Sequence, residues 1–180
     1  MQERNIIQKL IHLWGRLYLK RKIRAKQRKS EFVSFDDARI VGLLYSLDSV
    51  ATYECISAYV HKLQDENKKV KAIGLVKKKE DTNRFLPKLS FDFIYTSDIN
   101  WFGKPSGTYA HEFMNLDFDI LIDISEKDDY TAEYLLSLSS AKLKAGQSNI
   151  CDIMIKQKQG IKLEDYIQEI DHYLRIIKKK

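Results

Sequence analysis

The chain has 180 residues, of which 44% are hydrophobic and 31% charged, a balance that is typical of one globular domain and excludes a largely disordered chain. Its formal net charge of +6 is uneven: residues 1–29 hold ten Lys and Arg against Glu3 alone, so they carry about +9 and the remainder about −3. No uninterrupted apolar stretch has the length of a membrane span, and the opening residues lack the pattern of a cleavable signal. We therefore expect a cytoplasmic protein that associates, at most, peripherally with the inner membrane.

The first predicted element is a helix over residues 4–29. No Pro interrupts it, and apolar side chains recur at three- and four-residue spacing in its first half. Residues 6–18 thus present an apolar face, which we expect to pack on the domain or on a protein partner. The second half is almost wholly basic, and its like charges gain stability when an anionic surface approaches. The predicted contacts to that surface are Arg16, Lys20, Arg21, Lys22, Arg24, Lys26, Arg28 and Lys29.

Two anionic partners fit this basic stretch. An anionic bilayer attracts it with up to ~1 kcal/mol per basic residue near the surface, and Trp14 and Tyr18 would lie at the interface. RNA, alone or in a ribonucleoprotein, attracts the same charges through counterion release. The sequence does not separate these two partners, and a solvated helix that packs on the domain is the alternative to both.

Residues 34–180 are predicted to form one α/β domain, preceded by an extension at residues 1–33. Residues 118–125 (FDILIDIS) are apolar without strict alternation, which is typical of a strand that helices cover on both faces. Residues 70–76 alternate enough to indicate a less deeply buried strand. Five or six strands with helices between most of them predict a doubly wound, mostly parallel sheet of Rossmann-like or flavodoxin-like type. Strands are predicted at 39–45, 70–76, 89–95, 118–124, 142–145 and 150–155, and helices at 50–66, 108–115, 129–141 and 163–177.

Polar residues follow the predicted strands, at the edge where an open α/β sheet binds ligands. Ser46 and Asp48 come after the first strand, and Asp123 and Ser125 end the strand at 118–124. Such residues suit a nucleotide or sugar phosphate, or they simply cap the next helices. A carboxylate inside a buried strand is costly unless it is paired or functional, so Asp123 is the sharpest candidate. Trp101 stacks a base or lines the mouth of this pocket, or else it covers the sheet edge.

No catalytic motif accompanies these residues. The chain has no glycine-rich phosphate loop and no Gly-x-Ser-x-Gly, and its four His occur singly, without a second ligand at metal-binding spacing. Cys55 and Cys151 have apolar neighbours and are expected to be reduced core residues. We predict no metal and no cofactor. Two functions stay open: a non-catalytic adaptor that docks through its basic helix, and a small enzyme or ligand-binding domain.

Several segments together resemble a protein family. They are the basic opening, DINWFGKP at 98–105, FDILIDIS at 118–125 and AKLKAG at 141–146. The family comprises uncharacterised proteins of about this length from Bacteroidota. The resemblance implies a single cytoplasmic α/β domain, and it transfers no activity, cofactor or catalytic residue.

Overall fold

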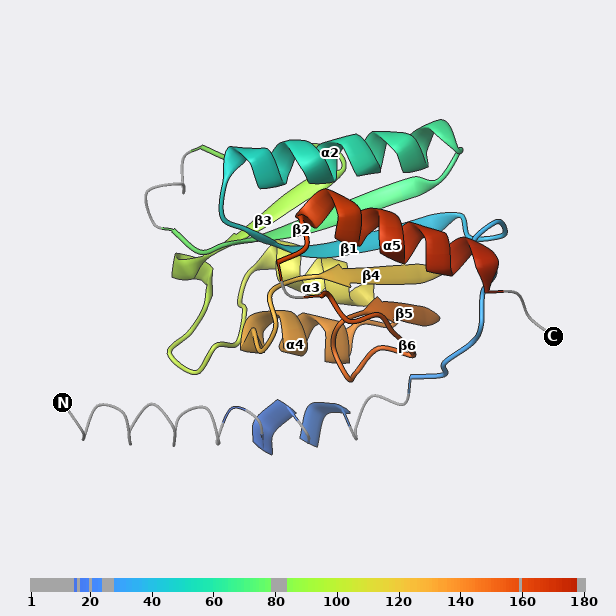
Figure 1. Cartoon of the computed structure of the whole chain (residues 1–180). Helices are drawn as coiled ribbons and strands as arrows, with labels where there is room; N and C mark the ends of the chain where they lie inside the picture. Colours follow the sequence, from blue (N-terminus) through green and yellow to red (C-terminus); the bar gives the residue numbers. More distant parts are fainter. Residues whose placement is uncertain are drawn as a thin grey trace.

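A six-stranded parallel sheet forms the centre of the protein (Figure 1). The computed structural model describes residues 15, 17–19, 21–23, 28–78, 84–158 and 160–177. The strand order β3-β2-β1-β4-β5-β6 is that of doubly wound folds, so the predicted fold class is confirmed. The strands are β1 (Ile40–Leu47), β2 (Lys69–Val76), β3 (Phe91–Tyr95), β4 (Ile120–Ile124), β5 (Leu143–Gly146) and β6 (Ile153–Met154).

Helices cover both faces of the sheet. Because strand side chains alternate, Leu43 and Ile122 belong to the core under α2 and α5, whereas Leu44 and Leu121 belong to the core under α3 and α4. Each residue of β4 is therefore buried, as its apolar sequence predicted. The helices are α2 (Val50–Asp65), α3 (Thr108–Asn115), α4 (Tyr130–Leu138) and α5 (Leu163–Ile176), with a short 3-10 turn, η2 (Thr96–Asp98), after β3.

An ionic cluster joins α2 to α5. Asp171 is 6% exposed and accepts hydrogen bonds from the Tyr59 hydroxyl (3.1 Å) and the Lys62 ammonium (2.7 Å). Arg175 donates to Asp171 (2.8 Å) and also pairs with Glu66 at the end of α2 (2.7 Å). Burial acts to raise the pKa of Asp171, but the hydrogen bonds from Arg175 and Lys62 outweigh it and hold that pKa below its ordinary value. The cluster thus holds the first helix of the domain against the last.

Two expectations about the strands are wrong. The strand at 70–76 is not shallow, because β2 lies between β1 and β3 and its residues 72–76 are all buried. The strand expected at 150–155 shrinks to the two residues of β6. Just before it, the Asp152 carboxylate accepts a hydrogen bond from the Lys144 N–H (2.8 Å) and pairs with Arg28, so side-chain contacts add to the short backbone pairing with β5.

The described part of the basic stretch lies against α4, on the lower side of Figure 1. We call residues 15–23 the basic segment, of which 15, 17–19 and 21–23 are described and helical. Leu19 is 2% exposed and packs against α4, whereas Leu17 is 51% exposed. Of the helix predicted over 4–29, residues 4–14, 16, 20 and 24–27 lie outside the described residues.

The end predicted for that helix is wrong. Arg28 and Lys29 are not helical, because Arg28 donates to the carbonyl oxygens of Ala141 (2.6 Å) and Lys142 (2.7 Å) at the start of β5. The chain therefore reaches the sheet in extended form. The predicted domain boundary at residues 33 and 34 stays a prediction.

Candidate functional site

The strand order reverses between β1 and β4, and a doubly wound sheet binds ligands in the crevice at the carboxyl ends of these two strands. In this protein, side chains and backbone groups from the loops after the strands contact one another there. The Ser46 hydroxyl oxygen accepts a hydrogen bond from the Glu126 N–H (2.9 Å). Lys77, just after β2, pairs with Asp129, and its ammonium lies 3.9 Å from the Glu126 carboxylate. These contacts tie together polar groups that would otherwise meet a ligand between the two strands.

The loop after β1 caps α2. The Ser49 hydroxyl oxygen accepts from the Thr52 N–H (3.1 Å), and the Thr52 hydroxyl donates to Asp48 (2.5 Å). Asp129 caps α4 in the same way, by accepting from the N–H groups of Thr131 (2.8 Å) and Ala132 (3.2 Å). Ser49 is thus the residue that caps α2, and Asp48 accepts a hydrogen bond from the Thr52 side chain beside this cap.

A cavity of about 560 Å³ opens beside the carboxyl end of β4, on the side toward β5. We call it the strand-end cavity. Asp123 and Ser125 line it, and Leu19 and Ile23 of the basic segment contribute to its wall. Five carboxylates face two lysines in its lining, which is unfavourable for a phosphate. Among the residues that the structure describes, no group of three or more His, Cys, Asp or Glu is placed to hold a metal ion.

Asp123 is both hydrogen-bonded and part of this lining. It is 2% exposed, and its Oδ1 accepts from the N–H (3.1 Å) and the hydroxyl (2.5 Å) of Ser125. Burial raises the pKa of Asp123 to about 6, although these two hydrogen bonds act to lower it. A carboxyl with this pKa changes charge near neutral pH.

Gly146 lets β5 approach the backbone of Asp123. Its φ is +153°, and a Cβ built on it would lie 2.4 Å from the Asp123 carbonyl oxygen. Side chains do not tolerate that distance, so only glycine fits. The position of Asp123 in the lining of the cavity therefore depends on a glycine in the neighbouring strand.

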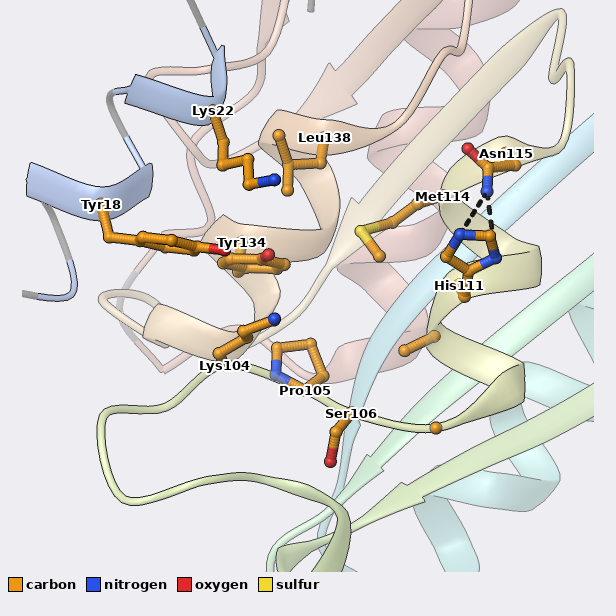
Figure 2. Close-up of a pocket in the computed structure, with 12 residues that line it drawn as sticks. Tyr18, Lys22, Lys104, Pro105, Ser106, His111, Met114, Asn115, Tyr134 and Leu138 are labelled. Atoms are coloured by element: carbon orange, nitrogen blue, oxygen red, sulfur yellow. Dashed lines mark hydrogen bonds between the residues drawn. The ribbon is translucent and has the colours of Figure 1, made fainter. Parts of the chain in front are cut away.

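A second cavity, of about 600 Å³, lies between the basic segment, the loop at 104–107, α3 and α4 (Figure 2). We call it the lysine cavity. Lys22 comes from the basic segment and Lys104 from the loop, and their ammonium groups lie 5.9 Å and 5.8 Å from the centre of the Tyr18 ring. No carboxylate is among the described residues that line it. The two cavities therefore differ in the sign of their charge.

The structure separates the five residues predicted for a ligand pocket. Asp123 and Ser125 line the strand-end cavity, and Ser46 reaches the same loop through Glu126. Asp48 lies in the cap of α2, and Trp101 is 73% exposed, with its ring edge-on to Phe102 (5.1 Å between ring centres). A ligand role for these residues stays a prediction.

The residues predicted to contact an anionic surface are only partly described. Arg21, Lys22 and Lys29 are exposed, whereas Arg28 is half-buried and paired with Asp152. Arg16, Lys20, Arg24 and Lys26 lie outside the described residues.

Both cysteines are free and only partly buried. Cys151 is the more deeply buried of the two, and its pKa is raised to about 12. The main cause is burial, and the nearby charge of Asp123 is the second. A thiol with that pKa is a poor nucleophile at neutral pH. Both cysteines were expected to be reduced core residues; they are free, and they pack against the core from partly buried positions.

Residues 12–177 match the model of a family of unknown function, DUF6913. Neither a curated protein nor a solved structure matches the chain. The expected resemblance to an uncharacterised family is confirmed in this respect, while the origin of its members in Bacteroidota stays a prediction.

Proposed function

The chain belongs to DUF6913, a family of unknown function, and from its geometry we propose a non-catalytic adaptor that docks on an anionic membrane surface through the basic segment. The observation that carries the proposal is the exposure of Leu17 (51%) next to exposed Arg21. Residues four apart on a helix share a face, so this aliphatic side chain and this cation point the same way, opposite to buried Leu19. Apolar and basic groups combined on one helix are typical of interfacial helices.

The anchoring of the segment supports this role. Leu19 packs on α4, and a few residues further along Arg28 holds the chain to the start of β5. The outward face is therefore presented by a fixed helix rather than by a free tail, which reduces the ordering entropy that binding costs. The charge of about +9 over residues 1–29 supplies attraction to acidic headgroups.

The exposed leucine favours a bilayer over RNA. RNA contacts use cations and stacking rings, so Leu17 would stay in water in such a complex. In a bilayer interface the exposed half of this side chain would be buried, which contributes about 1 kcal/mol beyond the charge attraction. Within the part of the chain that the structure describes, no helix combines the length and the apolarity needed to cross a membrane.

Co-sedimentation of the full chain with phosphatidylcholine vesicles, with and without phosphatidylglycerol, tests the proposal. Arg21→Glu changes two charges at the surface, so at ~1 kcal/mol per charge it should weaken binding to acidic vesicles by more than about tenfold. Leu17→Ser should weaken binding less and make it more sensitive to salt. The matched control is Lys162→Glu, which makes the same charge change beside α5, on the opposite face of the sheet.

Two results would contradict membrane docking. One is equal loss of binding in Arg21→Glu and Lys162→Glu, which would mean that net charge and not the basic segment determines binding. The other is tight binding to an RNA oligonucleotide together with no binding to acidic vesicles at low salt.

A second candidate function is the binding of a small polar ligand in the strand-end cavity. The observation that favours it is Asp123, a buried carboxyl with a raised pKa in the lining of a cavity. The five carboxylates of the lining favour a cationic or neutral ligand, and a nucleotide or sugar phosphate would have to bring a cation with it. Thermal shift with nucleotides, sugar phosphates and polyamines tests this function, and no stabilisation at millimolar ligand would count against it.

A further inference from the structure

We propose that the lysine cavity binds a phosphate monoester whose organic part is apolar. This site is separate from the outward face of the basic segment and from the strand-end cavity. It is built from four parts of the chain that meet only in the folded protein: the basic segment, the loop at 104–107, α3 and α4 (Figure 2).

The charged end of the cavity suits a phosphate. Lys22 and Lys104 approach the Tyr18 ring from two different elements, and no ion pair joins either of them to a described carboxylate. The two ammonium groups lie on opposite sides of the Tyr18 ring in Figure 2, so an anion that enters the cavity is attracted by both and forms charge-assisted hydrogen bonds with the one that it reaches. The start of α3 lines the same cavity at Gly107, which provides no side-chain cap for the first turn, so backbone N–H groups add to the positive potential.

The rest of the lining is mostly apolar. Ala110 and Met114 of α3 face Tyr134 and Leu138 of α4 across the cavity, as Figure 2 shows for the labelled residues. Met adapts its shape to different ligands, and Tyr134 is 3% exposed, which makes it a fixed wall. A volume of about 600 Å³ lies within the range of small-molecule sites. A phosphate at the lysines would thus leave its apolar part beside Met114 and Leu138.

A phosphate monoester with an apolar part can come from two sources. One is the lipid phosphatidic acid, which would insert its headgroup and the start of its acyl chains. The other is a soluble phosphorylated metabolite that carries an apolar group. The ligand class is the same in both cases. The test therefore begins with soluble probes and then separates the sources by competition.

Isothermal titration calorimetry of the full chain with phenyl phosphate, inorganic phosphate and phenol tests the site. Phenyl phosphate should bind more tightly than either half of the molecule alone. Lys104→Met should weaken its binding by about tenfold or more, because one charge-assisted hydrogen bond is lost. Lys104→Arg should retain most of the binding, and Lys162→Met, the control beside α5, should not change it. In NMR spectra, phenyl phosphate should shift the signals of His111 and Met114, which line the cavity.

The site is refuted if phenyl phosphate at millimolar concentration gives neither heat nor shifts at His111 and Met114, or if Lys104→Met binds it as the wild type does. Competition by soluble dihexanoyl phosphatidic acid assigns the site to a lipid, and binding of phenyl phosphate without such competition assigns it to a soluble metabolite. Membrane docking is tested separately: Lys104→Met should still bind acidic vesicles, and Arg21→Glu should still bind phenyl phosphate.

Discussion

Replacing Asp123 by Asn should remove a specific part of the pH dependence of stability. The carboxyl has an ordinary pKa of 3.8 and a folded-state pKa of about 6, because burial disfavours its charged form. The folded protein therefore binds more protons than the unfolded chain between these two values, and stability falls as pH rises through about 6. Over the full window the shift corresponds to about 3 kcal/mol at 1.36 kcal/mol per pKa unit.

The effect of Asp123 is best measured between about pH 7.5 and about pH 5. Asp119, Asp152 and Asp171 have lowered pKa values and therefore titrate below this range. Wild type should gain about 1 kcal/mol from Asp123 over that range, and Asp123→Asn should lose this gain while keeping an oxygen that accepts from Ser125. Urea unfolding followed by circular dichroism measures both slopes. Asp128→Asn is the matched control, since Asp128 is exposed in the same loop and its φ of +63° suits Asn. Parallel curves for wild type and Asp123→Asn would refute the argument from burial.

Two further predictions concern the contacts that hold helices in place. Leu19→Ala should weaken the docking of the basic segment on α4 by about 2 kcal/mol, so that amide hydrogen exchange in residues 17–23 speeds up by about 30-fold, while Leu17→Ala leaves it unchanged. Unchanged exchange in Leu19→Ala would mean that Leu19 does not fix the segment. Asp171→Asn should lower the free energy of unfolding by about 2 kcal/mol at neutral pH, because Lys62 and Arg175 lose their shared partner. Since the pKa of Asp171 is lowered, this stabilisation is present above the ordinary carboxyl pKa of 3.8 and lost as pH falls below it, so the gap between wild type and variant should close in acid. A gap that stays constant down to about pH 3 would contradict the ionic origin of the effect.

Much of the fold could be predicted from local pattern. The apolar run at 118–124 predicted a central strand because β-branched and aromatic residues without alternation mark strands that are covered on both faces. Helix spacing placed α3 at the residues that the structure shows, and α2 and α5 within one residue of them. The error at β2 has a physical reason: its polar residues Lys69 and Lys71 lie at the start of the strand, where Lys71 pairs with Asp92, and the five residues after them are buried.

The candidate sites were predicted less completely. Asp123 could be found because a carboxylate in a buried strand is a strong local signal, and it does line a cavity. The bridge between Ser46 and Glu126 could not be predicted, since it depends on how two loops 80 residues apart meet. Lys104 gave no signal either: one lysine in a loop is common, and its place in the lysine cavity depends on Lys22 and Tyr134, which come from distant segments.

The outward face of the basic segment is proposed to bind acidic membranes. The most direct test of this proposal is the binding of the full chain to vesicles with and without phosphatidylglycerol, measured as salt rises from about 50 mM to about 200 mM. We predict binding to acidic vesicles only, with a part that persists at the higher salt because Leu17 enters the interface. Equal binding to neutral and acidic vesicles, or no binding to either at the lower salt, would contradict the claim.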